Sequence, residues 1–136
     1  MSYESAQPRM TLEFAGKSYD VTATFALIDQ IEWALKDNII NVTMRALDLP
    51  TRDMAKIIAC MINSTGEKMT EAQAGEKIFE LGIASSEYAA LSIQILALLR
   101  IALVKPSERE ATKDEMGKLM GKLKEASLGA NTEKSA

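Results

Sequence analysis

A long apolar run constrains this chain more than any other feature of its sequence. The run extends from Tyr88 to Val104, and its aliphatic residues fall on all sides of a helix. It is shorter than the about 18 to 20 residues that a membrane span needs, and it contains Gln94 and Arg100. Pro106 ends it, because proline lacks an N–H and biases the preceding residue away from helical geometry. We therefore predict a core helix that is surrounded by other elements.

A β-hairpin is predicted at the N-terminal end of the domain. Apolar and polar residues alternate over Met10–Phe14 and again over Tyr19–Val21, with Ala15-Gly16-Lys17 between them. Two strands alone are marginal in water, so their apolar face should lie on helices. Residues 1–9 are predicted to be a flexible N-terminus, and their polar start has no secretory-signal pattern.

Helical spacing and capping residues predict several helices between the hairpin and the apolar run. Thr24 is the expected N-cap of the first, and a short segment follows from Val42 to Leu47. Pro50–Asp53 supplies a cap and an acidic residue for the next helix. Thr70–Gln73 has the pattern of a capping box, and Gly82 marks a helix end. The strongest amphipathic stripe matches helical spacing at every position: Met54, Ile57, Ile58, Met61 and Ile62.

The composition changes after Pro106, where charged residues become frequent. We predict a hairpin-plus-bundle domain over residues 10–106 and a charged, partly helical tail over 107–136. Ser107–Glu110 has a capping-box pattern, and Gly129–Ala136 is predicted to be disordered. Gly117 and Gly121 weaken the tail helix by roughly 1 kcal/mol each relative to alanine, so it needs a partner or the domain surface. Because the core should end near Pro106, we expect removal of the tail to change the melting temperature little.

The predicted fold class is mainly α with a small β part (α+β). A hairpin packs on a bundle of about four to five helices, and a charged C-terminal amphipathic helix or tail follows. The 136 residues suffice for one such domain with its own core.

The residue types that most common catalytic devices require are missing. The chain has no histidine and one cysteine, which excludes His-based acid–base chemistry, Cys/His zinc sites and an intramolecular disulfide. Cys60 is predicted to be a small buried hydrophobe, and Glu76 with Glu80 a solvated pair beside Lys77. The glycines do not form a phosphate-binding loop. We therefore predict a non-enzymatic, cytoplasmic protein without catalytic, cofactor-binding or metal-binding residues.

The charge pattern does not favour nucleic-acid binding. Lys and Arg number 16 against 19 Asp and Glu, which makes the formal net charge −3, and no basic block stands out. One alternative is a DNA-binding regulator with a helix-turn-helix within Val42–Ile62. That segment carries three basic and two acidic residues: Arg45, Arg52, Lys56, Asp48 and Asp53.

Two features point to protein binding. Trp33 projects nearly opposite the apolar stripe of its helix, between Asp29 and Asp37, where an isolated indole can anchor a partner. The alternative interpretation is that Trp33 covers the hairpin or another helix inside the monomer. The tail carries a methionine-rich stripe that suits a partner helix, unless the tail is loosely docked or frayed. The stripe consists of Met116, Leu119, Met120 and Leu123.

Stretches between Met10 and Pro106 carry a resemblance to a known family. They are Leu12–Val21, Thr24–Glu32, Pro50–Met54 and Thr70–Gly75. Their order of turns, caps and apolar positions resembles a family of small phage-tail proteins of prophages and gene transfer agents, described as tail assembly chaperones and also labelled tail tube proteins. A charged extension as long as the one after Pro106 is not expected of that family's compact core, so the resemblance does not assign it a role.

The resemblance implies a helper protein in the cytoplasm of a bacterial host. Its partner would be the long, helical tape-measure protein or another tail protein, with no nucleic acid and no membrane, and homo-oligomers are possible. The family supplies no catalytic residue. The main alternative is a structural tail subunit of the tube or a connector, which would polymerise through large interfaces.

Overall fold

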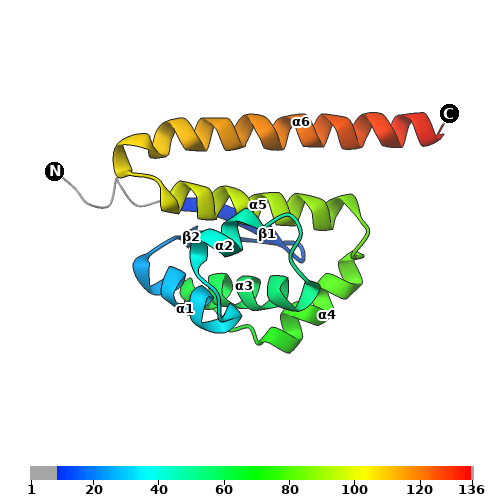
Figure 1. The fold of residues 1–136 in the computed structure, drawn as a ribbon. Helices are drawn as coiled ribbons and strands as arrows, with labels where there is room; N and C mark the ends of the chain where they lie inside the picture. The colour runs from blue at the N-terminus through cyan, green and yellow to red at the C-terminus, as the bar shows by residue number, and fades with distance from the viewer. Residues whose placement is uncertain (1–8, 136) are drawn as a thin grey trace.

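A computed structural model describes the backbone of residues 9–135 and the side chains of residues 9–122. An N-terminal hairpin is followed by helices that pack around α3, so the predicted α+β class is confirmed (Figure 1). The elements are β1 (Arg9–Phe14), β2 (Lys17–Thr22), α1 (Phe25–Leu35), α2 (Ile39–Met44), α3 (Thr51–Ser64), α4 (Glu71–Leu81), α5 (Ser86–Leu103), the 3₁₀ turn η2 (Pro106–Glu108) and α6 (Arg109–Ser135). The predicted flexibility of residues 1–8 lies outside the described residues, and Arg9 begins β1.

The hairpin forms as predicted, with a turn one residue shorter than the sequence suggested. Ala15 and Gly16 have φ values of +53° and +78°, the left-handed conformation that two-residue hairpin turns require. Phe14 therefore pairs with Lys17, and the antiparallel register continues to Arg9 opposite Thr22. One face of the hairpin is buried: Leu12, Phe14, Tyr19 and Val21.

Short polar side chains begin most of the helices, as their positions in the sequence predicted. The Thr24 hydroxyl accepts a hydrogen bond from the Leu27 N–H at 3.2 Å. Thr70 and Gln73 form the expected reciprocal capping box at α4. The Ser85 hydroxyl caps α5 by accepting a hydrogen bond from the Tyr88 N–H at 3.1 Å. These caps satisfy N–H groups that have no partner within the helix.

Three helix starts differ from the prediction. The second helix starts at Ile39, earlier than expected, because Asn38 accepts a hydrogen bond from the Asn41 N–H at 2.9 Å. Pro50 precedes α3 without a side-chain cap, since proline has no hydroxyl or carboxylate to offer. Ser107 is not an N-cap, because Pro106 starts a 3₁₀ turn that already contains Ser107.

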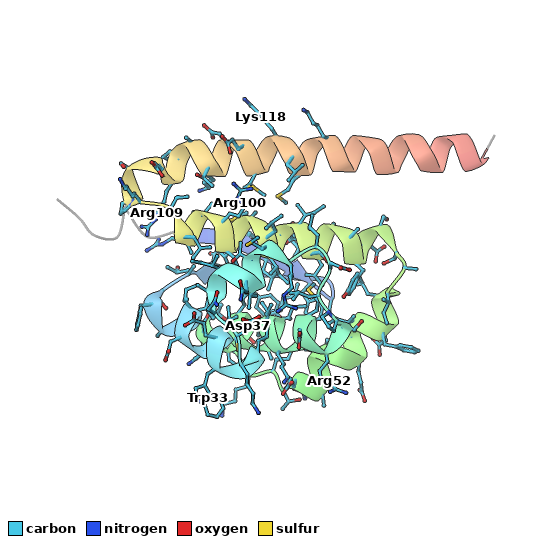
Figure 2. The ribbon with its side chains drawn as sticks, viewed as in Figure 1. Trp33, Asp37, Arg52, Arg100, Arg109 and Lys118 are labelled. Carbon is cyan, nitrogen blue, oxygen red and sulfur yellow. The ribbon has the colours of Figure 1, made fainter. Side chains whose placement is uncertain are left out.

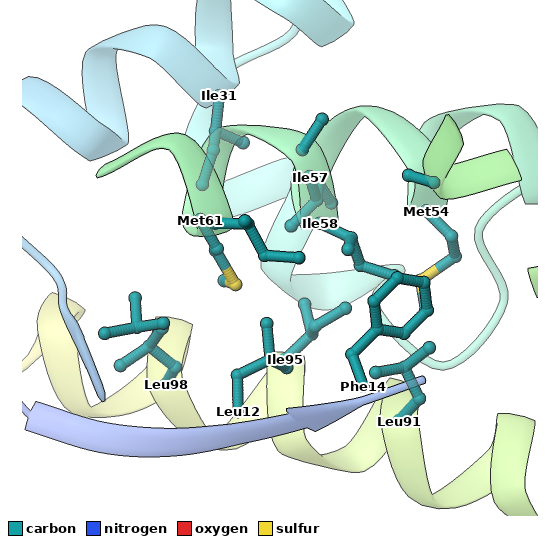
Figure 3. Close-up of a cluster of buried hydrophobic side chains, with 14 of the residues drawn as sticks. Leu12, Phe14, Ile31, Met54, Ile57, Ile58, Met61, Leu91, Ile95 and Leu98 are labelled. Atoms are coloured by element: carbon teal, nitrogen blue, oxygen red, sulfur yellow. The ribbon is translucent and has the colours of Figure 1, made fainter. Parts of the chain in front are cut away.

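The core lies between α3 and a layer made by β1 and α5 (Figure 3). The predicted stripe of α3 is buried at every position: Met54, Ile57, Ile58, Met61 and Ile62. It meets Phe14 from the hairpin, Ile31 from α1 and Ile95 from α5. Helical and alternating patterns from distant parts of the sequence therefore converge on one cluster.

Helix α5 is the core helix that the apolar run predicted. By length and composition it could cross a membrane, with a mean hydropathy of 1.4 over its 18 residues, but it contributes to the core in this structure. Leu91, Ile95 and Leu98 face the α3 cluster. On the opposite side, three residues that we call the outer face of α5 are also buried: Ile93, Ala97 and Ile101.

The tail helix α6 lies along α5, on the side away from α3 (Figure 1). Met116 is 3% exposed, which places it against the outer face of α5. The predicted boundary near Pro106 and the predicted disorder of Gly129–Ala136 stay predictions.

Candidate protein-interaction site

Trp33 is presented to solvent on α1. Its side chain is 82% exposed and points away from the body of the molecule (Figure 2). The interpretation in which Trp33 covers the hairpin or another helix is therefore wrong. A shallow hollow beside the indole is lined by Asp29, Glu32 and Lys36. A large aromatic with a polar rim has the composition of an interface anchor, and the binding role of Trp33 stays a prediction.

Polar contacts hold the junction between α1 and α2. The Asp37 carboxylate accepts hydrogen bonds from Asn41 Nδ2 at 3.1 Å and from Arg45 Nη2 at 2.7 Å. The hydrogen bond from Asn41, followed by the backbone N–H of the next residue and by Arg45, lowers the pKa of Asp37 below its ordinary value of 3.8. Glu32 Oε2 accepts a hydrogen bond from the Ile39 N–H at 2.8 Å. Asp37 thus holds the linker to the α2 segment, and Glu32 joins α1 to the start of α2.

Helix α2 presents a second apolar surface, which the sequence did not reveal. We call it the α2 face; it consists of Ile40, Met44 and Leu47. The i, i+4 spacing of Ile40 and Met44 places them on one side of α2, and Leu47 is exposed in the turn that follows the helix. Met44 is 81% exposed. The other side of this segment is buried through Ile39 and Val42. Because apolar residues occupy both sides, spacing alone could not show which side faces solvent.

The methionine-rich stripe of the tail is not a free surface in this structure. Met116 is buried, Met120 is half-buried, and Leu119 is 37% exposed. The side chain of Leu123 lies outside the described residues. Trp33 and α6 lie at opposite ends of the molecule, so the structure does not bring the two predicted binding features together (Figure 2).

The sequence singled out three side chains that could be reactive: Cys60, Glu76 and Glu80. Cys60 is half-buried on α3, and burial, reinforced by the charge of Glu71, raises the pKa of its thiol above the ordinary value of 9.0. The thiol is therefore protonated at neutral pH and is a poor nucleophile. Glu76 and Glu80 are both exposed, as expected of a solvated pair. Within the described side chains, no group of three His, Cys, Asp or Glu residues could hold a metal ion.

Two of the three basic residues in the segment of the alternative helix-turn-helix interpretation form intramolecular polar contacts. Arg45 pairs with Asp37. Lys56 Nζ donates to the Ala34 carbonyl at 3.3 Å and lies 3.8 Å from Glu71. Arg52 is exposed on α3 (Figure 2). These contacts leave little positive charge on α2 and α3 for a phosphate backbone.

The fold defines the class of protein as a two-stranded hairpin packed on a helical bundle. Comparison of the chain with protein-family models, with curated proteins and with solved structures finds no match. The resemblance to tail assembly chaperones therefore stays a prediction.

Proposed function

We propose that this protein is a non-enzymatic tail assembly chaperone that works in the cytoplasm of a bacterial host. It binds an apolar helical segment of the tape-measure protein through Trp33 and the α2 face. The binding surface is argued from the structure, whereas the identity of the partner rests on the family resemblance.

The main observation in support of this proposal is that α1 and α2 expose large apolar side chains beside a well-buried core. Trp33 and Met44 each leave more than four fifths of their surface in water, while every apolar residue of the α3 stripe is buried. Exposed apolar side chains that stand singly are common, but the α2 face groups three of them within residues 40–47. Such grouping supports a partner surface.

The chemistry of these side chains favours a helical, apolar partner. Methionine is flexible and polarisable, so Met44 adapts to differently shaped side chains. Tryptophan supplies a large rigid contact area with one polar N–H. The rim around Trp33 carries charges of both signs, from Asp29, Glu32 and Lys36. Such rim charges orient a partner more than they add to its affinity. A surface of this kind can shield an aggregation-prone helix before it is assembled.

Co-expression with the cognate tape-measure protein tests the proposal. We expect the wild-type chain to co-purify with the tape-measure protein and to raise its soluble fraction. Trp33→Ala should weaken binding by about 2 kcal/mol or roughly thirtyfold, the effect of a hot-spot residue. Met44→Asp with Leu47→Asp should weaken it further, because charges would enter an apolar contact.

Phe79→Ala is the matched control. Phe79 is also an exposed aromatic, at 77%, but it lies on α4. Its replacement should leave binding unchanged. If the wild-type chain neither co-purifies with the tape-measure protein nor changes its solubility, and is instead present at high copy in finished particles, the chaperone proposal fails in favour of a structural tail subunit.

A further inference from the structure

The contact between α5 and α6 is apolar and narrow. The outer face of α5 is buried, and its central residue, Ala97, allows a neighbouring helix to come close. From α6, Thr112 and Met116 are buried in return, whereas Leu119 remains more than one third exposed. The outer face of α5 is therefore a surface shaped for a helix, and α6 occupies it in cis.

Polar groups contribute little to holding α6 in place. Among the side chains that the structure describes, no ion pair or side-chain hydrogen bond joins α6 to the rest of the molecule. At the start of α6, the buried Nε of Arg109 has no hydrogen-bond partner among the described residues. A buried N–H without a partner weakens the packed arrangement, because its hydration is lost without compensation.

Two glycines weaken α6 without helping it to pack. A Cβ added at Gly117 or Gly121 would meet nothing within 4 Å, and both residues are exposed. Neither glycine has the positive φ that would require it. Each replacement by alanine would therefore favour the helix roughly fivefold, and the pair about thirtyfold. Helix α6, which covers the outer face of α5, is thus less stable than the same helix with alanine at these two positions.

We propose that the outer face of α5 is a second docking surface, which α6 covers until an amphipathic helix of a partner protein replaces it. The turn from Val104 to Glu108 acts as the hinge, because Pro106 interrupts the helix between α5 and α6. The incoming helix presents small or apolar side chains at i, i+4 and i+8, as α6 does with Thr112, Met116 and Met120. The assignment of that partner as the tape-measure protein rests on the proposed function, whereas the exchange itself does not.

A partner of different sequence fits this surface better than a second copy of the chain. The glycines weaken α6 equally in every copy, so an exchange between copies would gain no helix stability. A partner helix without such glycines competes with α6 for the outer face of α5, and its affinity is favoured about thirtyfold. The weak cover therefore favours a foreign helix.

A peptide experiment with the full chain tests the exchange. The probe is a fluorescent peptide of residues 107–136 that carries Gly117→Ala and Gly121→Ala, and its binding is followed by anisotropy. Met116→Asp in the full chain should release α6 and bind the probe most tightly. The full chain with Gly117→Ala and Gly121→Ala should bind the probe about thirtyfold more weakly than the wild type, because α6 is closed more of the time.

Gly75→Ala is the matched control for a helix glycine outside α6. Its Cβ would meet the Cβ of Ala55 at 4.0 Å, an ordinary contact, so the substitution should leave probe binding unchanged. Hydrogen exchange of the α6 amides should slow in the double-alanine chain and not in Gly75→Ala. This readout does not depend on Met116→Asp, so the test survives if that variant does not fold.

Three results would overturn the exchange. One is equal probe binding by the wild-type and double-alanine chains. Another is no binding to a Met116→Asp chain that keeps the wild-type circular dichroism of the bundle. The third is a wild-type dimer that exchanges α6 between copies, seen by light scattering, which would make a second copy the occupant. Because the probe comes from this chain, failure here and failure to bind the tape-measure protein are separate results.

Discussion

The α3 stripe and the α6 stripe obey the same sequence rule and have different energetic roles. Both place apolar residues at helical spacing, and both form helices. Every member of the α3 stripe is buried and is contacted from several elements, whereas α6 packs mainly on α5 and buries Thr112 and Met116 among its described side chains. Spacing therefore predicts that a helix is amphipathic, but the number of neighbours decides how much stability its apolar side contributes.

The largest effect should come from removing side-chain volume in the α3 stripe. Ile58→Ala deletes a fully buried side chain and leaves a cavity among α3, the hairpin and α5. We expect a loss of about 2–5 kcal/mol in the free energy of unfolding, measured by urea denaturation.

Met116→Ala is the matched substitution on α6. The extensive contacts of α6 with the bundle are those with α5. The loss in the free energy of unfolding should therefore be smaller than for Ile58→Ala. Equal losses in the two variants would show that α6 is part of the core and would remove the contrast between the two stripes.

The local features of the fold could be read from the sequence because they depend on neighbouring residues. The cap at Thr24 and the capping box of Thr70 and Gln73 each require side chains within three positions. The capping-box pattern at Ser107 failed for an equally local reason, since Pro106 imposed a 3₁₀ turn first.

The candidate site was harder to predict, because exposure depends on what other elements cover. Helical spacing placed Trp33 opposite the buried stripe but could not exclude a neighbour over the indole. The α2 face was missed, because Ile39 and Ile40 are both apolar and only the packed bundle distinguishes them. For Met116 the difference is the opposite one. The sequence predicted an apolar stripe that suits a partner, whereas in the folded chain α5 covers Met116.

The next largest effect should follow removal of residues 107–136. The sequence suggested little change in melting temperature, but the structure shows that this truncation uncovers the outer face of α5. We now expect a fall of about 4–8 °C, equivalent to roughly 1 kcal/mol for a domain of this size, by differential scanning calorimetry. Concentration-dependent association should accompany it, because an apolar strip is exposed. An unchanged melting temperature together with a monomer at high concentration would contradict this expectation.

A smaller effect on stability is expected at Trp33. Since the indole is 82% exposed, Trp33→Ala should change the free energy of unfolding by less than about 0.5 kcal/mol. The wild-type fluorescence emission should be that of an indole in water and should shift to shorter wavelength when the tape-measure protein binds. A loss of about 3 kcal/mol, as for a truncated core aromatic, would mean that Trp33 packs inside the molecule after all.

The smallest effect concerns the polar junction that positions Trp33 relative to the α2 face. The pKa of Asp37 is held below 3.8 in the folded chain, so its ionised form stabilises the fold above that pH. This contribution is lost as the pH falls through the lowered pKa, because protonation then occurs in the folded state too. Asn41→Ala removes the hydrogen bond that lowers this pKa most and should raise the pKa of Asp37 toward 3.8 in a carboxyl NMR titration.

Gln30→Ala, on the exposed side of α1, is the control and should leave the pKa of Asp37 unchanged. If Asn41→Ala also leaves it unchanged, Asn41 does not hold the carboxylate in solution. The junction would then depend on Arg45, whose ion pair with Asp37 is exposed and weakens with added salt. Salt should in that case loosen the contact between the linker and the α2 segment and weaken binding through Trp33 and the α2 face together. With Asn41 in place, hydrogen bonds from an uncharged amide persist in salt, so affinity for the tape-measure protein should change little with ionic strength.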